Sequence, residues 1–174
     1  MVELSNVTKV YVMTNRYHVY VEMAAALFEI YAEKILKKSI SYDENIKADI
    51  QMIRVHETVP ASDIDDTTLV FGDLSHEMKQ YEKYDPTFFD GLYDSFGLLW
   101  LNLIGKFPNM ENSMGSRIRY DMRKEFRWNR KERHVYYGLD NTRILAGEAK
   151  SESYTKRFKN ALLEKFESAG YRFD

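Results

Sequence analysis

The N-terminal part of the chain carries apolar patterns of both strand and helix period. Residues 8–14 alternate apolar with polar side chains and are rich in β-branched and aromatic types, which predicts a strand. Apolar residues then recur every three or four positions over residues 17–38, which predicts a helix with one apolar face. Residues 49–55 and 67–73 predict two more strands. This order of elements predicts an α/β or α+β fold in which helices pack a mixed sheet of about three to five strands.

The pattern in the middle and at the end of the chain predicts mainly helices. Residues 75–84 predict a short helix, and residues 86–107 carry the widest apolar stripe, which predicts a helix that packs on the sheet beside the first one. Polar and small residues over 109–116 predict a loop, which we interpret as a hinge within one domain, because the segment beyond it is too short for a core of its own. A last helix is predicted over residues 151–168, and Gly170 is expected to end it.

Length and composition narrow the class of protein. The chain has 174 residues, enough for one hydrophobic core, so we expect residues 1–174 to form a single domain. It has no cysteine, which excludes disulfides, thiolate zinc sites and cysteine nucleophiles, and which favours a reducing compartment; we therefore expect a cytoplasmic protein. The N-terminus lacks the features of an export signal. The most apolar run, residues 96–107, is shorter than the roughly 20 residues that span a membrane, so we expect no membrane contact.

The net charge of −2 is the sum of two parts of opposite sign. Residues 1–114 contain 10 basic and 18 acidic side chains, whereas residues 115–174 contain 15 basic and 9 acidic ones. Opposite blocks of this kind are typical of proteins that bind nucleic acid or another polyanion. The two parts can equally dock on each other, either within one chain or across a homodimer.

A cationic helix is predicted over residues 117–131. Ile118, Met122 and Phe126 fall on one side of it, and arginines and lysines form a continuous arc opposite. Aromatic side chains lie among these cations, as they do where proteins follow a phosphate backbone and stack on bases. The predicted nucleic-acid-binding residues are Arg117, Arg119, Tyr120, Arg123, Lys124, Arg127, Trp128, Arg130 and Lys131. The alternative is a solvated helix whose arginines pair with the acidic part of the chain.

A hairpin is predicted after the cationic helix, with Asp140 in its turn and Glu148 and Lys150 at its end. These residues are similar to the Asp…Glu-x-Lys core of the PD-(D/E)XK nucleases. The resemblance implies that Asp140 and Glu148 hold a divalent metal such as Mg²⁺, that Lys150 helps to activate water, and that Glu125 is a third carboxylate. The chain departs from that family in the short gap between Asp140 and Glu148 and in Leu139, which replaces a proline.

A third interpretation is a protein-interaction module, such as an inhibitor or an assembly component, in which both charged parts are docking surfaces. The composition, rich in aromatic residues, lysine and aspartate and with only 3 prolines, is typical of an AT-rich microbial or phage genome. Neither this interpretation nor nucleic-acid binding requires a cofactor, whereas the nuclease requires Mg²⁺.

The segment "ASDIDDTTLVF" contains an Asp-x-Asp-x-Thr pattern that is similar to the nucleophile loop of haloacid dehalogenase-like phosphatases. The resemblance implies that Asp63 attacks phosphorus and Asp65 acts as acid and base. In that family the loop follows a buried strand, whereas Pro60 precedes it here and lacks the N–H that a central strand donates. We therefore interpret the segment as an aspartate-rich turn with a solvated surface. The alternative is a weak Mg²⁺ or Ca²⁺ site formed by Asp63, Asp65, Asp66 and Asp73.

Overall fold

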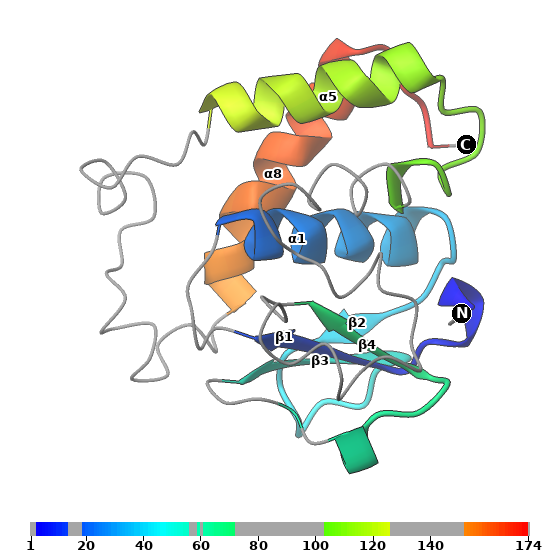
Figure 1. The fold of residues 1–174 in the computed structure, drawn as a ribbon, viewed down its shortest axis with the longest axis vertical. Coiled ribbons are helices and arrows are strands. Elements are labelled where there is room, and N and C mark those ends of the chain that lie inside the picture. Colours follow the sequence, from blue (N-terminus) through cyan, green and yellow to red (C-terminus); the bar gives the residue numbers. More distant parts are fainter. Residues whose placement is uncertain are drawn as a thin grey trace.

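The structure is a computed structural model that describes residues 3–13, 19–55, 59, 61–71, 103–125 and 152–173. The strands in these residues are β1 (Lys9–Met13), β2 (Ile40–Ser41), β3 (Ile50–Val55) and β4 (Thr68–Phe71). The α-helices are α1 (Val19–Lys34), α5 (Asn112–Glu125) and α8 (Glu152–Ser168), and the short 3₁₀ helices are η1 (Leu4–Asn6) and η2 (Ala61–Asp63). Figure 1 shows their arrangement.

The described strands form one sheet in the order β2-β3-β1-β4, and every neighbouring pair is parallel. This confirms the predicted α/β class and the expected number of strands, but the sheet is parallel rather than mixed. The physical reason lies in the connection between β1 and β3, because a chain that crosses over through a helix returns in the same direction. The pattern predicted β1, β3 and β4, whereas β2 has only two residues and gave no periodic signal.

The described helices form layers on the sheet. Figure 1 shows α1 beside the sheet and α8 with α5 beyond α1, and the tertiary contacts join α1 to α8 and α8 to α5. Strand alternation explains the first layer: Val10, Val12 and Met52 point to one face and are fully buried, whereas Tyr11 and Ile53 point to the other and are half-buried. Two of these inward positions, Val10 and Met52, are register partners across the β1–β3 ladder. The core therefore lies between the sheet and α1.

An aromatic cluster joins α1, α8 and the segment before α5. Its members are Tyr31, Phe107, Phe166, Tyr171 and Phe173. The ring of Phe107 lies 5.3 Å from Tyr31 and 5.2 Å from Phe166, measured between centroids. The Tyr171 hydroxyl donates a hydrogen bond of 2.6 Å to the carbonyl of Pro108. The cluster therefore fixes the C-terminal segment against the start of the α5 region.

The end of α8 has the geometry of a Schellman motif. The backbone N–H of Tyr171 donates to the carbonyl of Phe166 at 3.0 Å, and that of Gly170 donates to Glu167 at 2.9 Å. Gly170 has a φ of 81°, which favours glycine because it has no Cβ. The rings of Phe166 and Tyr171 are in contact at 5.4 Å, the apolar contact that accompanies this motif. The prediction that Gly170 ends the last helix is confirmed.

We expect Gly170→Ala to lower the free energy of unfolding by about 1 kcal/mol, because an alanine at this φ is strained. An added Cβ would meet no atom within 4 Å, so the cost is conformational and not steric. Urea denaturation followed by circular dichroism measures the change. Ser168→Ala, at the exposed last residue of the helix, is the matched control and should stay within about 0.5 kcal/mol of the parent protein. Equal stabilities for the two variants would contradict the assigned helix end.

The boundaries of the predicted elements differ from the observed ones at two places. Residues 112–116 belong to α5, so the prediction of a loop over 109–116 is wrong for most of that range. The reason is tertiary: Gly115 is buried and lies against Ile104, where a Cβ would come within 3.3 Å of the Ile104 side chain. The predicted 86–107 helix ends early, since only residues 103 and 104 are helical in its described part. The rest of that helix, the 75–84 helix and the predicted hairpin lie outside the described residues.

Candidate functional site

The outer face of α5 carries the described part of the predicted cationic surface. Arg117, Tyr120 and Lys124 are spaced by three and four residues, so they share one side of the helix, and all three are exposed. Tyr120 is 66% exposed, whereas Ile118 and Met122 are fully buried. The predicted division of this helix into an apolar and a solvent side is therefore confirmed as far as Glu125. We refer to Arg117, Tyr120 and Lys124 as the α5 face.

The carboxylates of α5 do not neutralise this face directly. Glu125 is directed to α8, where its Oε2 lies 2.5 Å from the Nζ of Lys165. Asp121 is half-buried. Among the ion pairs of the described residues, none involves Arg117 or Lys124. The described contacts therefore give no support to the alternative in which these two cations pair with the acidic part of the chain.

The structure describes only some of the remaining predicted site residues. Arg119 belongs to α5 and is half-buried, so it faces solvent less than the sequence pattern suggested. The backbone of Arg123 belongs to α5, but its side chain lies outside the described residues. The other predicted nucleic-acid-binding residues and the predicted catalytic and metal-binding residues also lie outside the described residues: Arg127, Trp128, Arg130, Lys131, Asp140, Glu148 and Lys150. The nuclease assignment therefore stays a prediction.

The aspartate-rich segment is a turn at the start of β4. The Oδ1 atom of Asp65 accepts hydrogen bonds from the Thr67 hydroxyl at 2.6 Å, from the Thr67 backbone N–H at 2.8 Å and from the Thr68 hydroxyl at 3.1 Å. These donors, first of all the Thr67 hydroxyl, hold the pKa of Asp65 below its usual value. The loop of a phosphatase follows a strand, whereas this turn precedes β4. The interpretation as a turn is confirmed.

No group of three metal-binding side chains is brought together in the described part of the chain. Asp63, Asp65 and Asp66 therefore do not form a cation site by themselves. Asp73, the fourth residue of the predicted site, lies outside the described residues.

A partly buried charged cluster was not predicted from the sequence. Its members are Glu29, Glu33, Tyr42, Arg54 and Lys159, and we call it the Glu29 cluster. Tyr42 donates a hydrogen bond of 2.9 Å to Oε2 of Glu29. The Nζ of Lys159 lies 2.7 Å from Oε1 of Glu33 and 3.7 Å from Oε1 of Glu29. The guanidinium of Arg54 lies 5.3 Å from the centroid of the Tyr42 ring.

Burial dominates the chemistry of Glu29, which is only 4% exposed. Loss of hydration raises its pKa from 4.5 to about 7, against the opposing effects of the Lys159 charge and the Tyr42 hydrogen bond. Glu33 raises that pKa further and Arg54 lowers it, both through their charges. Near neutral pH this carboxyl is therefore present in both its protonated and its ionised form, and a pKa shifted in this way is common at functional sites.

Local signals for part of the Glu29 cluster exist in the sequence. Glu29 is the one charged residue between Met23 and Ala32, in a run that is otherwise apolar. Arg54 occupies an inward strand position, in alternation with Ile50 and Met52. Lys159, by contrast, is 126 residues away from its partner Glu33, so no local pattern joins them.

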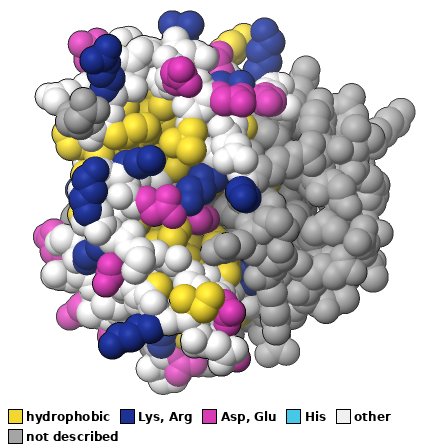
Figure 2. Space-filling model, turned by 180° about the vertical axis from the view of Figure 1, so that it is seen from behind, with side chains coloured by type: hydrophobic (Ala, Val, Ile, Leu, Met, Phe, Trp, Pro, Cys, Tyr) yellow, Lys and Arg dark blue, Asp and Glu magenta, His cyan; other side chains and the backbone are white. Residues whose placement is uncertain are grey.

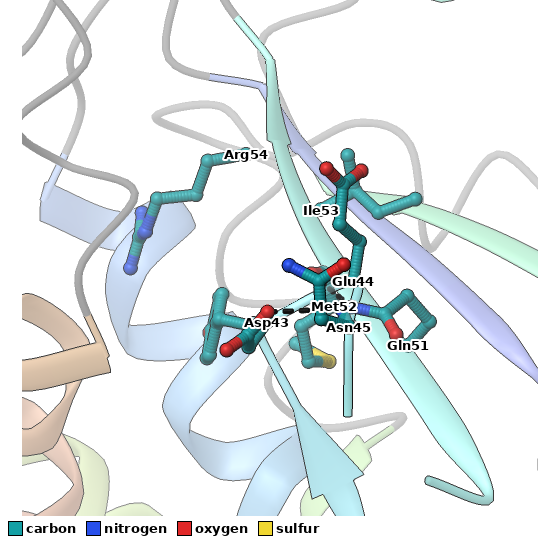
Figure 3. Close-up of a pocket in the computed structure, with 8 residues that line it drawn as sticks. Asp43, Glu44, Asn45, Gln51, Met52, Ile53 and Arg54 are labelled. Atoms are coloured by element: carbon teal, nitrogen blue, oxygen red, sulfur yellow. Dashed lines mark hydrogen bonds between the residues drawn. The ribbon is translucent and has the colours of Figure 1, made fainter. Parts of the chain in front are cut away.

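Two pockets flank the Glu29 cluster. One, of about 350 Å³, lies beside β3, and Figure 3 shows Asp43, Asn45 and Gln51 grouped in it, with Arg54 extending away from them. The other, of about 270 Å³, is lined by residues of α1, β2 and α8. Figure 2 shows acidic and basic side chains interspersed on the face opposite to that drawn in Figure 1, and not a field of one sign. On this face, the described residues thus offer local charged sites and no broad basic patch.

In the part of the chain that the structure describes, helices are too short or too polar to traverse a lipid bilayer. Comparison with protein-family models, curated proteins and solved structures finds no match to this chain.

Proposed function

We propose that this protein binds nucleic acid, or a related polyanion, through the α5 face. The observation that supports this most is the 66% exposure of Tyr120 between two exposed cations on one helix side. A large aromatic side chain that is mostly in water contributes little to packing, whereas it offers a flat surface on which a base can stack. The excess of basic residues beyond residue 114 is consistent with this proposal.

The spacing along α5 suits a chain of phosphates. Arg117 and Lys124 are separated by two helical turns, which corresponds to about 10 Å along the helix axis. Tyr120 lies between them on the same side. One base can therefore stack on the ring while the phosphates on either side of it meet the two cations. Arginine adds bidentate contacts to a phosphate, which a lysine cannot make.

We expect the double variant Arg117→Gln/Lys124→Gln to weaken binding to a labelled oligonucleotide and to reduce its salt dependence. Each lost phosphate contact lowers the slope of log K against log salt by about 0.7 on a single strand and about 0.9 on a duplex. Fluorescence anisotropy over a salt series measures both effects. The control is Lys47→Gln/Lys106→Gln, which removes the same number of exposed charges elsewhere. Equal slopes for the two double variants, or no binding by the parent protein at low salt, would reject the proposed function.

Tyr120→Ala is expected to weaken binding to single-stranded oligonucleotides by about 5- to 150-fold, because one stacked base contributes about 1–3 kcal/mol. Binding to heparin, which has no bases, should change little. Tyr120→Phe keeps the ring and should bind as the parent protein does. A loss of affinity that is equal for heparin and for oligonucleotides would show that the residue acts through charge placement or folding and not through stacking.

The nuclease and the protein-interaction module stay predictions, since the residues that would distinguish them lie outside the described part of the chain. A reducing, cytoplasmic location is likewise part of the proposal and is supported by the absence of cysteine.

A further inference from the structure

The pocket between α1 and α8 has the chemistry of a small anion site. Its polar lining comes from two helix sides: Lys156, Lys159 and Asn160 on α8, and Glu29 and Glu33 on α1. Lys159 and Asn160 lie three and four residues after Lys156, so two ammonium groups and one amide line the same cavity. The two ammonium groups and the amide supply several hydrogen-bond donors, which an oxyanion needs as partners.

The two lysines of this pocket are in different states. Lys156 is exposed, and no ion pair in the described residues involves it. Lys159 is half-buried and donates to Glu33 at 2.7 Å. The side chain of Glu33 is 33% exposed, so it can rotate into water at little cost. Glu33 thus occupies the place beside Lys159 that a ligand oxygen would take.

We propose that this pocket binds a small molecule with an oxyanion group, such as a carboxylate or a phosphate or sulfate ester, on Lys156, Lys159 and Asn160. The ligand replaces the Glu33 carboxylate at Lys159 and gains the ammonium of Lys156. The cavity of about 270 Å³ limits the ligand to a compact molecule. Ile40 supplies a half-buried apolar wall for its carbon skeleton.

Glu29 couples this binding to proton uptake. Glu29 lines the pocket, and Lys159, Tyr42, Glu33 and Arg54 are the titratable and charged groups that act on its carboxyl. A bound anion adds a negative charge near this carboxyl, which favours its protonated form. The protonated carboxyl can also donate a hydrogen bond to the ligand. Binding is therefore expected to be tighter near pH 6 than near pH 8.

The test is a titration of the full chain with sodium sulfate and with sodium acetate, followed by the amide chemical shifts of α1 and α8. Sulfate keeps one charge state across this pH range, and the two probes separate a tetrahedral from a planar oxyanion. Lys156→Gln should weaken binding about fivefold, whereas Glu33→Gln should tighten it about fivefold, since it releases Lys159. Lys106→Gln, an exposed lysine outside the pocket, is the control and should change nothing.

Lys156→Gln and Glu33→Gln each remove one charge from the same pocket, yet they should change the affinity in opposite directions. This result would distinguish a specific binding site from general attraction of an anion to a basic surface. Glu29→Gln should bind with an affinity that does not depend on pH. If neither anion shifts the α1 and α8 resonances near pH 6, or if Glu33→Gln binds no better than the parent protein, the proposal is overturned. Folding of each variant is checked by its amide spectrum, so a loss of structure is recognised separately.

Discussion

Phe107→Ala is expected to destabilise the protein by about 3–5 kcal/mol, the range for a buried phenylalanine whose removal leaves a cavity. Phe107 is 2% exposed, and its ring contacts four other aromatic rings of α1, α8 and the C-terminal segment. These elements are distant in the chain, so few local movements can fill the space. Urea denaturation followed by far-ultraviolet circular dichroism gives the change in the free energy of unfolding.

The control for Phe107→Ala is Tyr120→Ala, which removes an exposed ring of similar size and should cost less than about 0.5 kcal/mol. Phe107→Leu should fall between the two, because it keeps part of the buried volume. If Phe107→Ala lowered the free energy of unfolding by less than about 1 kcal/mol, the aromatic cluster would not be what holds α1 and α8 together.

Glu29→Gln is expected to raise the free energy of unfolding near pH 8 and to leave it almost unchanged near pH 5. The pKa of Glu29 is about 7 in the folded protein and 4.5 in the reference state, so the folded protein binds this proton more tightly than the unfolded chain does. The resulting stabilisation is fully present below about pH 4.5 and is lost as the pH rises through 7. The full loss is about 3 kcal/mol, and about 2–3 kcal/mol of it falls between pH 5 and pH 8.

Glutamine imitates the protonated form, because its carbonyl can still accept the hydrogen bond from the Tyr42 hydroxyl. Unfolding by urea at a series of pH values gives the slope for both proteins. Glu44→Gln, which neutralises an exposed carboxyl, is the control and should leave the slope nearly as it is in the parent protein. Equal pH dependence of the parent protein and Glu29→Gln would mean that this carboxyl is not held away from water.

The fold was predictable in so far as each element forms from its own residues. The strand alternation of residues 8–14 and the helix period of residues 17–38 match β1 and α1 with differences only at the ends. The C-terminal helix and its end at Gly170 followed from local chemistry in the same way. The α5 prediction failed at its start, because Ser113 and Gly115 are typical of loops, and the contact between Gly115 and Ile104 cannot be seen in the sequence.

Of the candidate sites, the α5 face was foreseen because helix period alone sets Arg117, Tyr120 and Lys124 on one side. The Glu29 cluster was not foreseen, since it depends on the meeting of α1, β3 and α8. Glutamate and arginine are seldom buried, so Glu29 and Arg54 each stand out in an apolar pattern. Their partners, however, depend on how distant segments pack together. Burial between these segments is what raises the pKa of Glu29, and burial is a property of the fold.

The sequence by itself determined the class of β1, α1, β3, β4 and α8, the separation of charge between the two parts of the chain and the amphipathic character of α5, because these depend on side chains a few residues apart. Only the tertiary structure decided that the sheet is parallel, that β2 extends it, and that Lys159 meets Glu29 and Glu33 beside a pocket. The reason is that strand order and buried ion pairs arise from contacts across long stretches of chain, whose energy no local pattern records.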